Sequence, residues 1–278
     1  MKFITGLVFL VSLILFSSVF VSPEIFPYAG LLPFFIPIAI ITNLFLLAIL
    51  VLSWRKLAFL PLIALILGYK FLLITFQFHS TNEDAQGLKV LTYNAHGFFY
   101  RKDKSEDLDL NVFTWLTEHP ADVKVFQEFY QDYTSASRNA IKLFGKNGEY
   151  EYAYHVVEGD PKKRFMGMAI FSRYPIVNQG VVFDNRQNNG AMFADIEVGG
   201  DTIRVYNTHL QSMAIQAESL DNYEEAKQVY RQTLGKLHRG SLARSKQLGV
   251  LFEHLSNSPH PVIPVSYTHL RAHETVLD

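Results

Sequence analysis

Polar side chains follow several short apolar segments in the second half of the chain, at the points where those segments end. Asn94 follows KVLTY and Glu128 follows VKVFQ, whereas Asn207 and His209 close IRVYNTH. Arg173 follows GMAIFS in the same way. Carboxylate and amide oxygens suit a partly hydrated Mg²⁺ ion, and a nearby imidazole can donate to a phosphate oxygen or to a leaving group. The pattern therefore predicts a rim of strand ends around a hydrolytic metal site.

Each of these residues also has a purely structural interpretation. Asn94 could turn the chain, Glu128 could end a strand in solvent, and His209 could be a half-buried histidine. Arg164 lies in the basic run KKR and is either a solvated loop charge or a contact for a substrate phosphate. Four further histidines are interpreted as structural: His96, His155, His238 and His254.

The elements that must position these side chains are a mixture of strands and helices. A good turn signal, Gly199-Gly200-Asp201, predicts a hairpin between two of the strands. Because strands and helices do not alternate strictly, the pattern predicts an α+β or layered α/β sandwich. Strands are expected at 89–93, 123–127, 150–157, 167–172, 191–198 and 202–208, and helices at 110–118, 218–237 and 242–255.

The first 78 residues have a different character. Apolar runs cover residues 3–21, 31–52 and 57–78, and only Lys70 interrupts the third. About 20 apolar residues are needed to cross a bilayer. The sequence therefore predicts a three-helix transmembrane anchor over 1–78 and a polar linker over 79–88. A cleaved signal peptide in place of the first span is the alternative.

The few charges beside the apolar runs predict an orientation. Lys2 precedes the first run, and Arg55 and Lys56 lie between the second and the third. The connection between the first two runs has no Lys or Arg. Because basic residues favour the cytoplasmic side, we expect the N-terminus inside and the globular domain outside the cytoplasm.

Composition excludes several classes of protein. Hydrophobic residues make up 49% of the 278 residues, which is too many for a disordered chain. From residue 79 onward, 21 basic residues face 25 acidic ones. This balance weakens non-specific binding to nucleic acid, because that binding depends on Lys and Arg. The absence of cysteine excludes disulfides, thiolate metal sites and a cysteine nucleophile.

Four segments in order, TYNAHG, ADVKVFQE, GMAIFSRYPI and NTHLQ, strongly resemble the endonuclease/exonuclease/phosphatase superfamily. The resemblance runs from about residue 89 to residue 263. It implies a sandwich of two mostly antiparallel sheets and a phosphoesterase that uses Mg²⁺, with Mn²⁺ as an alternative. The apolar first quarter looks like that of membrane-anchored bacterial members, which implies an integral protein of the bacterial inner membrane.

The resemblance also implies roles for individual residues. Asn94 matches a residue that contacts metal or phosphate, and Glu128 matches the metal-binding glutamate. Asn207 lies in the strand that faces the site, and His209 matches a histidine that stabilises or protonates groups around the scissile phosphate. Both are expected to be catalytic. The expected partners are a phosphate-ester substrate, nucleic acid among the candidates, and the bilayer. Nothing indicates an obligate protein partner.

The pattern of the family stops near Ile263. A strand with Gly-Asp-x-Asn should follow, and later an Asp-His pair, but residues 264–278 read PVSYTHLRAHETVLD. These residues resemble a translated adapter or cloning junction. We therefore expect a foreign tail on a truncated domain, inactivity of this chain and activity of its full-length parent. The alternative is a membrane-anchored, non-catalytic binding protein.

Overall fold

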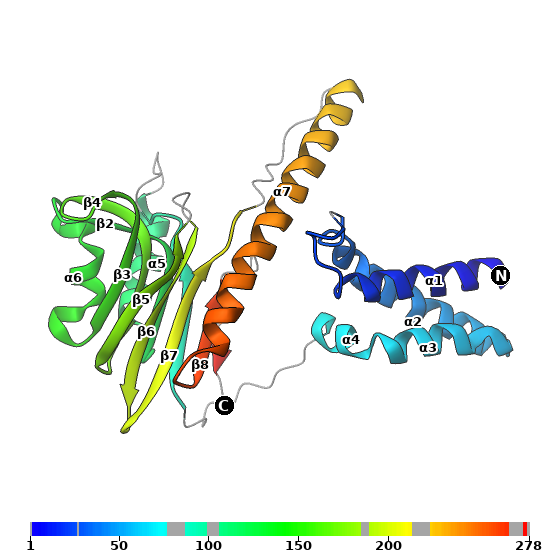
Figure 1. Cartoon of the computed structure of the whole chain (residues 1–278), viewed down its shortest axis with the longest axis horizontal. Coiled ribbons are helices and arrows are strands. Elements are labelled where there is room, and N and C mark those ends of the chain that lie inside the picture. The colour runs from blue at the N-terminus through cyan, green and yellow to red at the C-terminus, as the bar shows by residue number, and fades with distance from the viewer. Residues whose placement is uncertain are drawn as a thin grey trace. The chain divides into compact units, whose positions relative to one another are not determined.

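The computed structural model of the chain describes residues 2–26, 28–76, 87–98, 106–184, 189–212, 223–266 and 275–276. The chain forms two units. One consists of residues 1–82 and 213–246, and the other of residues 83–212 and 247–278 (Figure 1).

Apolar helices form the first part of the first unit. Leu15 and Phe16 of one helix pack with Ile40 of the next and Leu65 of a third. A polar contact joins the first two helices, because the amide Nδ2 of the buried Asn43 donates to the hydroxyl of Ser12 over 2.7 Å. The helices are α1 (Lys2–Ser18), α2 (Ile36–Leu52), α3 (Phe59–Leu67) and α4 (Tyr69–Thr75), with 3₁₀ turns at Leu32–Phe35 and Lys56–Ala58.

The length of these helices bears on the expected membrane spans. Among the described residues, one helix, Leu32–Leu52, is long and apolar enough to cross a bilayer. The segments Lys56–Leu67 and Tyr69–Thr75 qualify only as one span bent by 69°. The bend lies at Gly68, where a Cβ atom would stand 2.7 Å from the ring of Phe16. At 17 residues α1 is shorter, so three spans stay a prediction.

Two β-sheets form the centre of the second unit. Strand order is β3-β4-β2-β1-β9 in the first sheet and β5-β6-β7-β8 in the second. Only the pairs β1–β2 and β7–β8 are parallel in the described residues. The strands are β1 (Lys89–Asn94), β2 (Val123–Asp132), β3 (Glu151–Asp160), β4 (Arg164–Ser172), β5 (Ile176–Asp184), β6 (Gly190–Val198), β7 (Asp201–His209), β8 (Val262–Ser266) and β9 (Thr275–Val276).

Helices cover the outer faces of both sheets (Figure 1). Phe113 and Leu116 of α5 (Glu106–Glu118) and Phe144 of α6 (Ala140–Phe144) pack on the first sheet. Leu251 of α7 (Tyr223–Ser256) packs on the second. Branched residues such as Val125 fill the space between the sheets. The α+β sandwich with two mostly antiparallel sheets is therefore confirmed.

Three elements differ from the sequence-based expectation. The helices expected at 218–237 and 242–255 are one helix, α7, because no proline interrupts that stretch. Strand β5 was not expected, because it is an irregular strand at the edge of its sheet, with polar residues and Gly180 in its middle. Strand β2 does not end at residue 127 but continues to Asp132.

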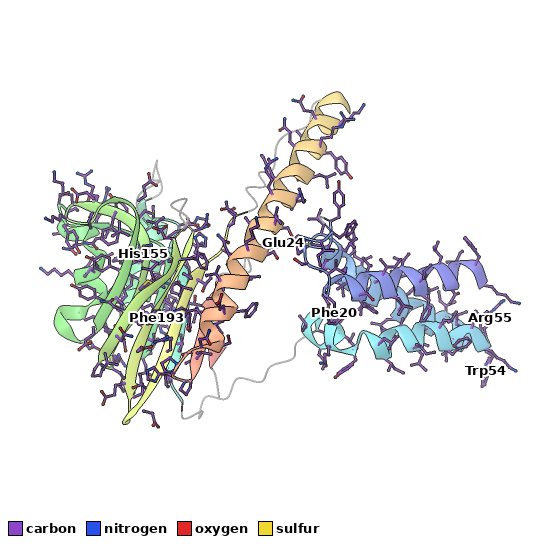
Figure 2. All side chains as sticks on the ribbon, in the orientation of Figure 1. Phe20, Glu24, Trp54, Arg55, His155 and Phe193 are labelled. Carbon is purple, nitrogen blue, oxygen red and sulfur yellow. The ribbon has the colours of Figure 1, made fainter. Side chains whose placement is uncertain are left out.

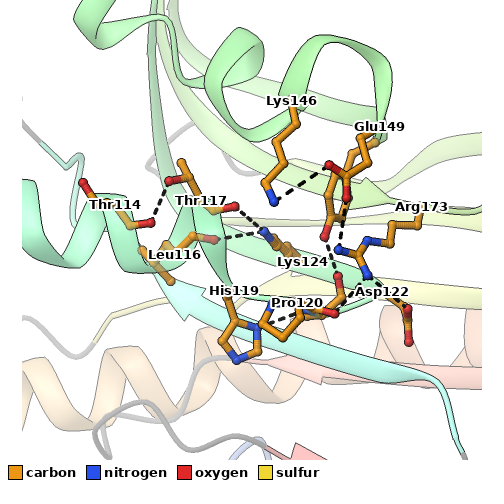
Figure 3. A network of polar contacts seen from close by, with 12 residues as sticks. Thr114, Leu116, Thr117, His119, Pro120, Asp122, Lys124, Lys146, Glu149 and Arg173 are labelled. Carbon is orange, nitrogen blue, oxygen red and sulfur yellow. Dashed lines mark hydrogen bonds and ion pairs between the residues drawn. The ribbon is translucent and has the colours of Figure 1, made fainter.

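Arg173 does not belong to the rim on which the sequence pattern placed it. Strand β4 runs antiparallel to β2, so Arg173 emerges beside Val123, at the start of β2. There its guanidinium lies 3.1 Å from Glu149 and donates to the carbonyl of Pro120 over 3.2 Å (Figure 3). The expectation for Arg173 was wrong because the sequence of a strand does not reveal its direction in the sheet.

The same end of the sheet contains a buried lysine. The ammonium of Lys124 donates to the carbonyls of Leu116 and Thr117, at 3.0 Å each (Figure 3). It thereby provides hydrogen bonds to carbonyl groups in the last turn of α5. It also lies 4.7 Å from the centre of the Tyr150 ring. Burial, reinforced by the positive charges of Lys146 and Arg173, lowers the pKa of Lys124 from 10.5 to about 8.

Candidate active site

Glu128 occupies a bulge in the middle of β2. Phe126 pairs with Ala169 and Phe129 pairs with Gly167, so Gln127 and Glu128 together oppose a single residue of β4. Glu128 has a φ of +47°, a conformation that costs roughly 1–2 kcal/mol for a residue with a Cβ atom. Bulges of this kind re-aim a side chain, and strained residues persist where the surrounding structure holds them.

Three side chains surround the carboxylate of Glu128. Nδ2 of Asn94, at the end of β1, donates to Oε1 over 3.1 Å. Nε2 of His209, the last residue of β7, lies 3.6 Å from the same oxygen. Nδ1 of His96 lies 3.3 Å from Oε2. The structure thus brings together Asn94, Glu128 and His209 from both sheets, as the sequence pattern predicted.

His96 also belongs to this group, although the sequence pattern favoured a structural role for it. It has a φ of +46°, and its backbone N–H donates to Oδ1 of Asn94 over 3.0 Å. This Asx turn at the end of β1 directs the imidazole back toward Glu128. The sequence signal was present, because an asparagine followed two residues later by His-Gly is typical of a turn with a left-handed residue.

Asn207 lies beneath the site and does not reach its surface. Its side chain is fully buried, and Nδ2 donates to the carbonyls of Phe126, at 2.8 Å, and Ala169, at 3.1 Å. Its Oδ1 accepts a hydrogen bond from Gln127 over 2.8 Å. Asn207 of β7 therefore joins the second sheet to strands β2 and β4 of the first sheet, at the bulge that carries Glu128.

Arg164 is not brought into contact with Glu128. It pairs with Asp132 at the far end of β2, with Nε 3.4 Å from Oδ2, and its side chain is 62% exposed. Asp132 lies four positions after Glu128 on β2, a distance of about 13 Å along a strand. The hydroxyl of Thr134 and, to a smaller extent, Arg164 hold the pKa of Asp132 below its usual value.

The side chains around Glu128 fit a hydrated Mg²⁺ ion with few protein ligands. In the described part of the chain, no group of three or more His, Cys, Asp or Glu side chains could hold a metal ion. Mg²⁺ commonly uses one or two carboxylates and completes its shell with water and substrate phosphate. Glu128 supplies one carboxylate. Oδ1 of Asn94 accepts from the backbone N–H of His96 and Nδ2 donates to Glu128, so Asn94 would give its amide oxygen to a metal only by exchanging both hydrogen bonds.

Comparison with known proteins identifies the class to which this fold belongs. The model of the endonuclease/exonuclease/phosphatase family matches residues 91–274. The chain therefore belongs to this family, whose members hydrolyse phosphodiester bonds and generally use divalent metal ions. A second match, to a domain of unknown function (DUF8431), covers residues 1–75. No match was found among curated proteins.

Several solved structures are similar to this chain at low sequence identity. A family protein from Leptotrichia buccalis is 15% identical, and 65% of this chain covers 66% of it with a TM-score of 0.40. Sphingomyelinase C from Streptomyces griseocarneus is 20% identical, with coverage of 66% and 64% and a TM-score of 0.42. The human nocturnin catalytic domain is 15% identical, with coverage of 64% and 62% and a TM-score of 0.42. The chain thus spans about two thirds of the length of these proteins.

Proposed function

We propose that the full-length parent of this chain is a Mg²⁺-dependent phosphoesterase that hydrolyses a phosphodiester or phosphomonoester at Glu128. The observation that carries the proposal is the bulge of β2, where a strained backbone directs a carboxylate toward Asn94, His96 and His209. Residues held in strained backbone conformations of this kind cluster at functional sites.

Each side chain has a distinct proposed role. Glu128 and Asn94 would hold the metal, which when bound neutralises charge on the phosphate and on the leaving oxygen. His209 donates a proton from Nε2 to a phosphate oxygen or to the leaving group as the oxygen of water bonds to phosphorus and the ester bond breaks. The proton that the attacking water loses passes to solvent. Asn207 acts as a positioning residue, because its contacts fix the bulge. Arg164 is proposed as a more distant contact for substrate phosphate.

The substrate belongs to one of three classes, namely nucleic acid, a phospholipid head group or a soluble phosphoester. The net acidic charge after residue 79 disfavours polyanions as a class. We place the parent in the bacterial inner membrane, with residues 1–78 as a three-helix anchor, 79–88 as a linker and the domain outside the cytoplasm. The long apolar helix Leu32–Leu52 supports this arrangement.

The present chain is proposed to be inactive. Residues 264–278 contain neither Gly-Asp-x-Asn nor a later Asp-His pair, although the family match extends to residue 274. Strand β8, which pairs with β7 at the edge of the second sheet, is the strand on which the family pattern would place Gly-Asp-x-Asn. The same observation supports a second candidate function, a membrane-anchored binding protein without catalysis.

The decisive experiment begins with the source DNA. We expect the genomic reading frame to continue past Ile263 into Gly-Asp-x-Asn, and the restored domain to hydrolyse bis(p-nitrophenyl) phosphate only with Mg²⁺ or Mn²⁺. Glu128→Gln should reduce the rate at least about 100-fold, because it removes the metal-binding charge. The control is Glu197→Gln. Glu197 is exposed and lies near the end of β6 that is remote from Gly190, the residue paired with His209. A frame that ends as written, or an active Glu128→Gln variant, would contradict the catalytic proposal.

A further inference from the structure

A second polar pair lies between the two sheets, on strands β3 and β5. Nε2 of His155 lies 3.5 Å from Oδ2 of Asp184. The His155 side chain is 15% exposed and that of Asp184 is 28% exposed. The two residues come from different sheets, as Glu128 and His209 do (Figure 2 labels His155).

Strand register aligns this pair with the proposed active site on both sheets. In the second sheet, Asp184 pairs with Gly190, and Gly190 pairs with His209. Residues directly opposite each other in antiparallel strands share a face, so Asp184 and His209 lie on the same face, about 10 Å apart. In the first sheet, His155 pairs with Met168, which lies opposite the bulge at Glu128.

Met168 and Gly190 lie between the two pairs. Met168 is buried between the sheets. A Cβ atom on Gly190 would stand 3.1 Å from Cε of Met168 and 3.1 Å from the carbonyl oxygen of Phe183. The glycine therefore lets the two sheets approach closely here, and it carries no side chain that would separate the two pairs.

We infer that His155 and Asp184 form a second subsite on the rim, which binds an ammonium group on the alcohol portion of the phosphoester substrate. This inference rests on the proposed function and names its substrate class. A phosphate bound at Glu128 and His209 places its ester substituent within reach of a pair about 10 Å away. The Asp184 carboxylate attracts a cation and repels a second phosphate. His155 positions the Asp184 carboxylate from the buried side.

The experiment compares two ligands that differ only in the amine. They are 2-aminoethyl p-nitrophenyl phosphate and ethyl p-nitrophenyl phosphate, titrated calorimetrically into the full chain with MgCl₂ present. We expect the amine ligand to bind more tightly, and Asp184→Asn to remove that preference with roughly a fivefold loss of affinity. Asp184→Asn should not change the affinity for the ethyl ligand. Asp201→Asn, at the turn between β6 and β7, is the control.

The outcomes separate the inference from the proposed function. Equal affinity for the two ligands, or an equal loss for both in Asp184→Asn, would overturn the subsite. Binding of neither ligand would overturn it as well. The proposed function is tested apart from this, by hydrolysis in the restored domain and its loss in Glu128→Gln. His155→Gln is a second variant, and it should weaken amine binding without changing the affinity for the ethyl ligand.

Discussion

Nε2 of His209 lies 3.6 Å from Oε1 of Glu128, although the two residues belong to different sheets. The contact exists because β7 ends where β2 bulges, and because Asn207 holds the two sheets together directly beneath. The proposed chemistry therefore depends on the packing of the sandwich and on the distortion of one strand.

The strain at Glu128 predicts a difference between two substitutions. Glu128→Gly and Glu128→Ala remove the same contacts, but only glycine adopts a φ of +47° without a steric penalty. We expect the glycine variant to exceed the alanine variant by about 1 kcal/mol in free energy of unfolding, measured by urea titration. Both variants should lack hydrolytic activity in the restored domain. Equal stability of the two variants would show that the residue is not strained.

Asn207 should be important for stability, because it is a positioning residue. Asn207→Ala removes a buried hydrogen bond from the amide of Gln127 and two buried hydrogen bonds to the carbonyls of Phe126 and Ala169. We expect a loss of about 3 kcal/mol in free energy of unfolding. Asn257→Ala is the matched control, because Asn257 is exposed, and its effect should stay within about 0.5 kcal/mol. Similar losses in the two variants would refute the positioning role.

The lowered pKa of Lys124 predicts that the free energy of unfolding depends on pH. Its pKa is about 8 in the folded protein against 10.5 for a free lysine, so the unfolded chain binds more protons between these values. Stability should therefore increase with pH from about 8 to 10.5, by up to about 3 kcal/mol, and this contribution should be absent below pH 8.

Lys124→Met isolates this contribution from other titrating groups. The difference in free energy of unfolding between the wild type and this variant should increase as the pH is raised from 8 to 10. Only the wild type has Lys124, whose pKa is lowered in the folded protein. Chemical unfolding at a series of pH values measures it. A difference that is constant over this range would show that Lys124 titrates normally.

The absence of cysteine makes the membrane topology directly testable. We expect a single cysteine introduced by Asp201→Cys to react with a membrane-impermeant maleimide in intact spheroplasts. A cysteine introduced by Arg55→Cys should react only after the membrane is opened, because Arg55 is expected on the cytoplasmic side. Labelling of both positions, or protection of Asp201→Cys, would contradict the proposed orientation.

Much of the candidate site was accessible from the sequence. Asn94 and His209 end their strands, and both could be recognised because a run of apolar residues closed by a polar one has a clear local signature. Glu128 was identified for a different reason than the structure gives. The sequence suggested a strand end, whereas the residue lies in a bulge that exists only because β2 pairs with β4.

Sequence alone indicates which residues are available for chemistry, the mixture of strands and helices, and the change from an apolar first quarter to a polar domain. These properties are local, since they depend on side-chain type and on spacings of a few residues. The tertiary structure decided the direction of β4, which placed Arg173 at the opposite end, and the burial of Asn207. It also placed His155 and Asp184 in register with Glu128 and His209. Strand direction and register arise from pairing between distant segments, so no local pattern could reveal them.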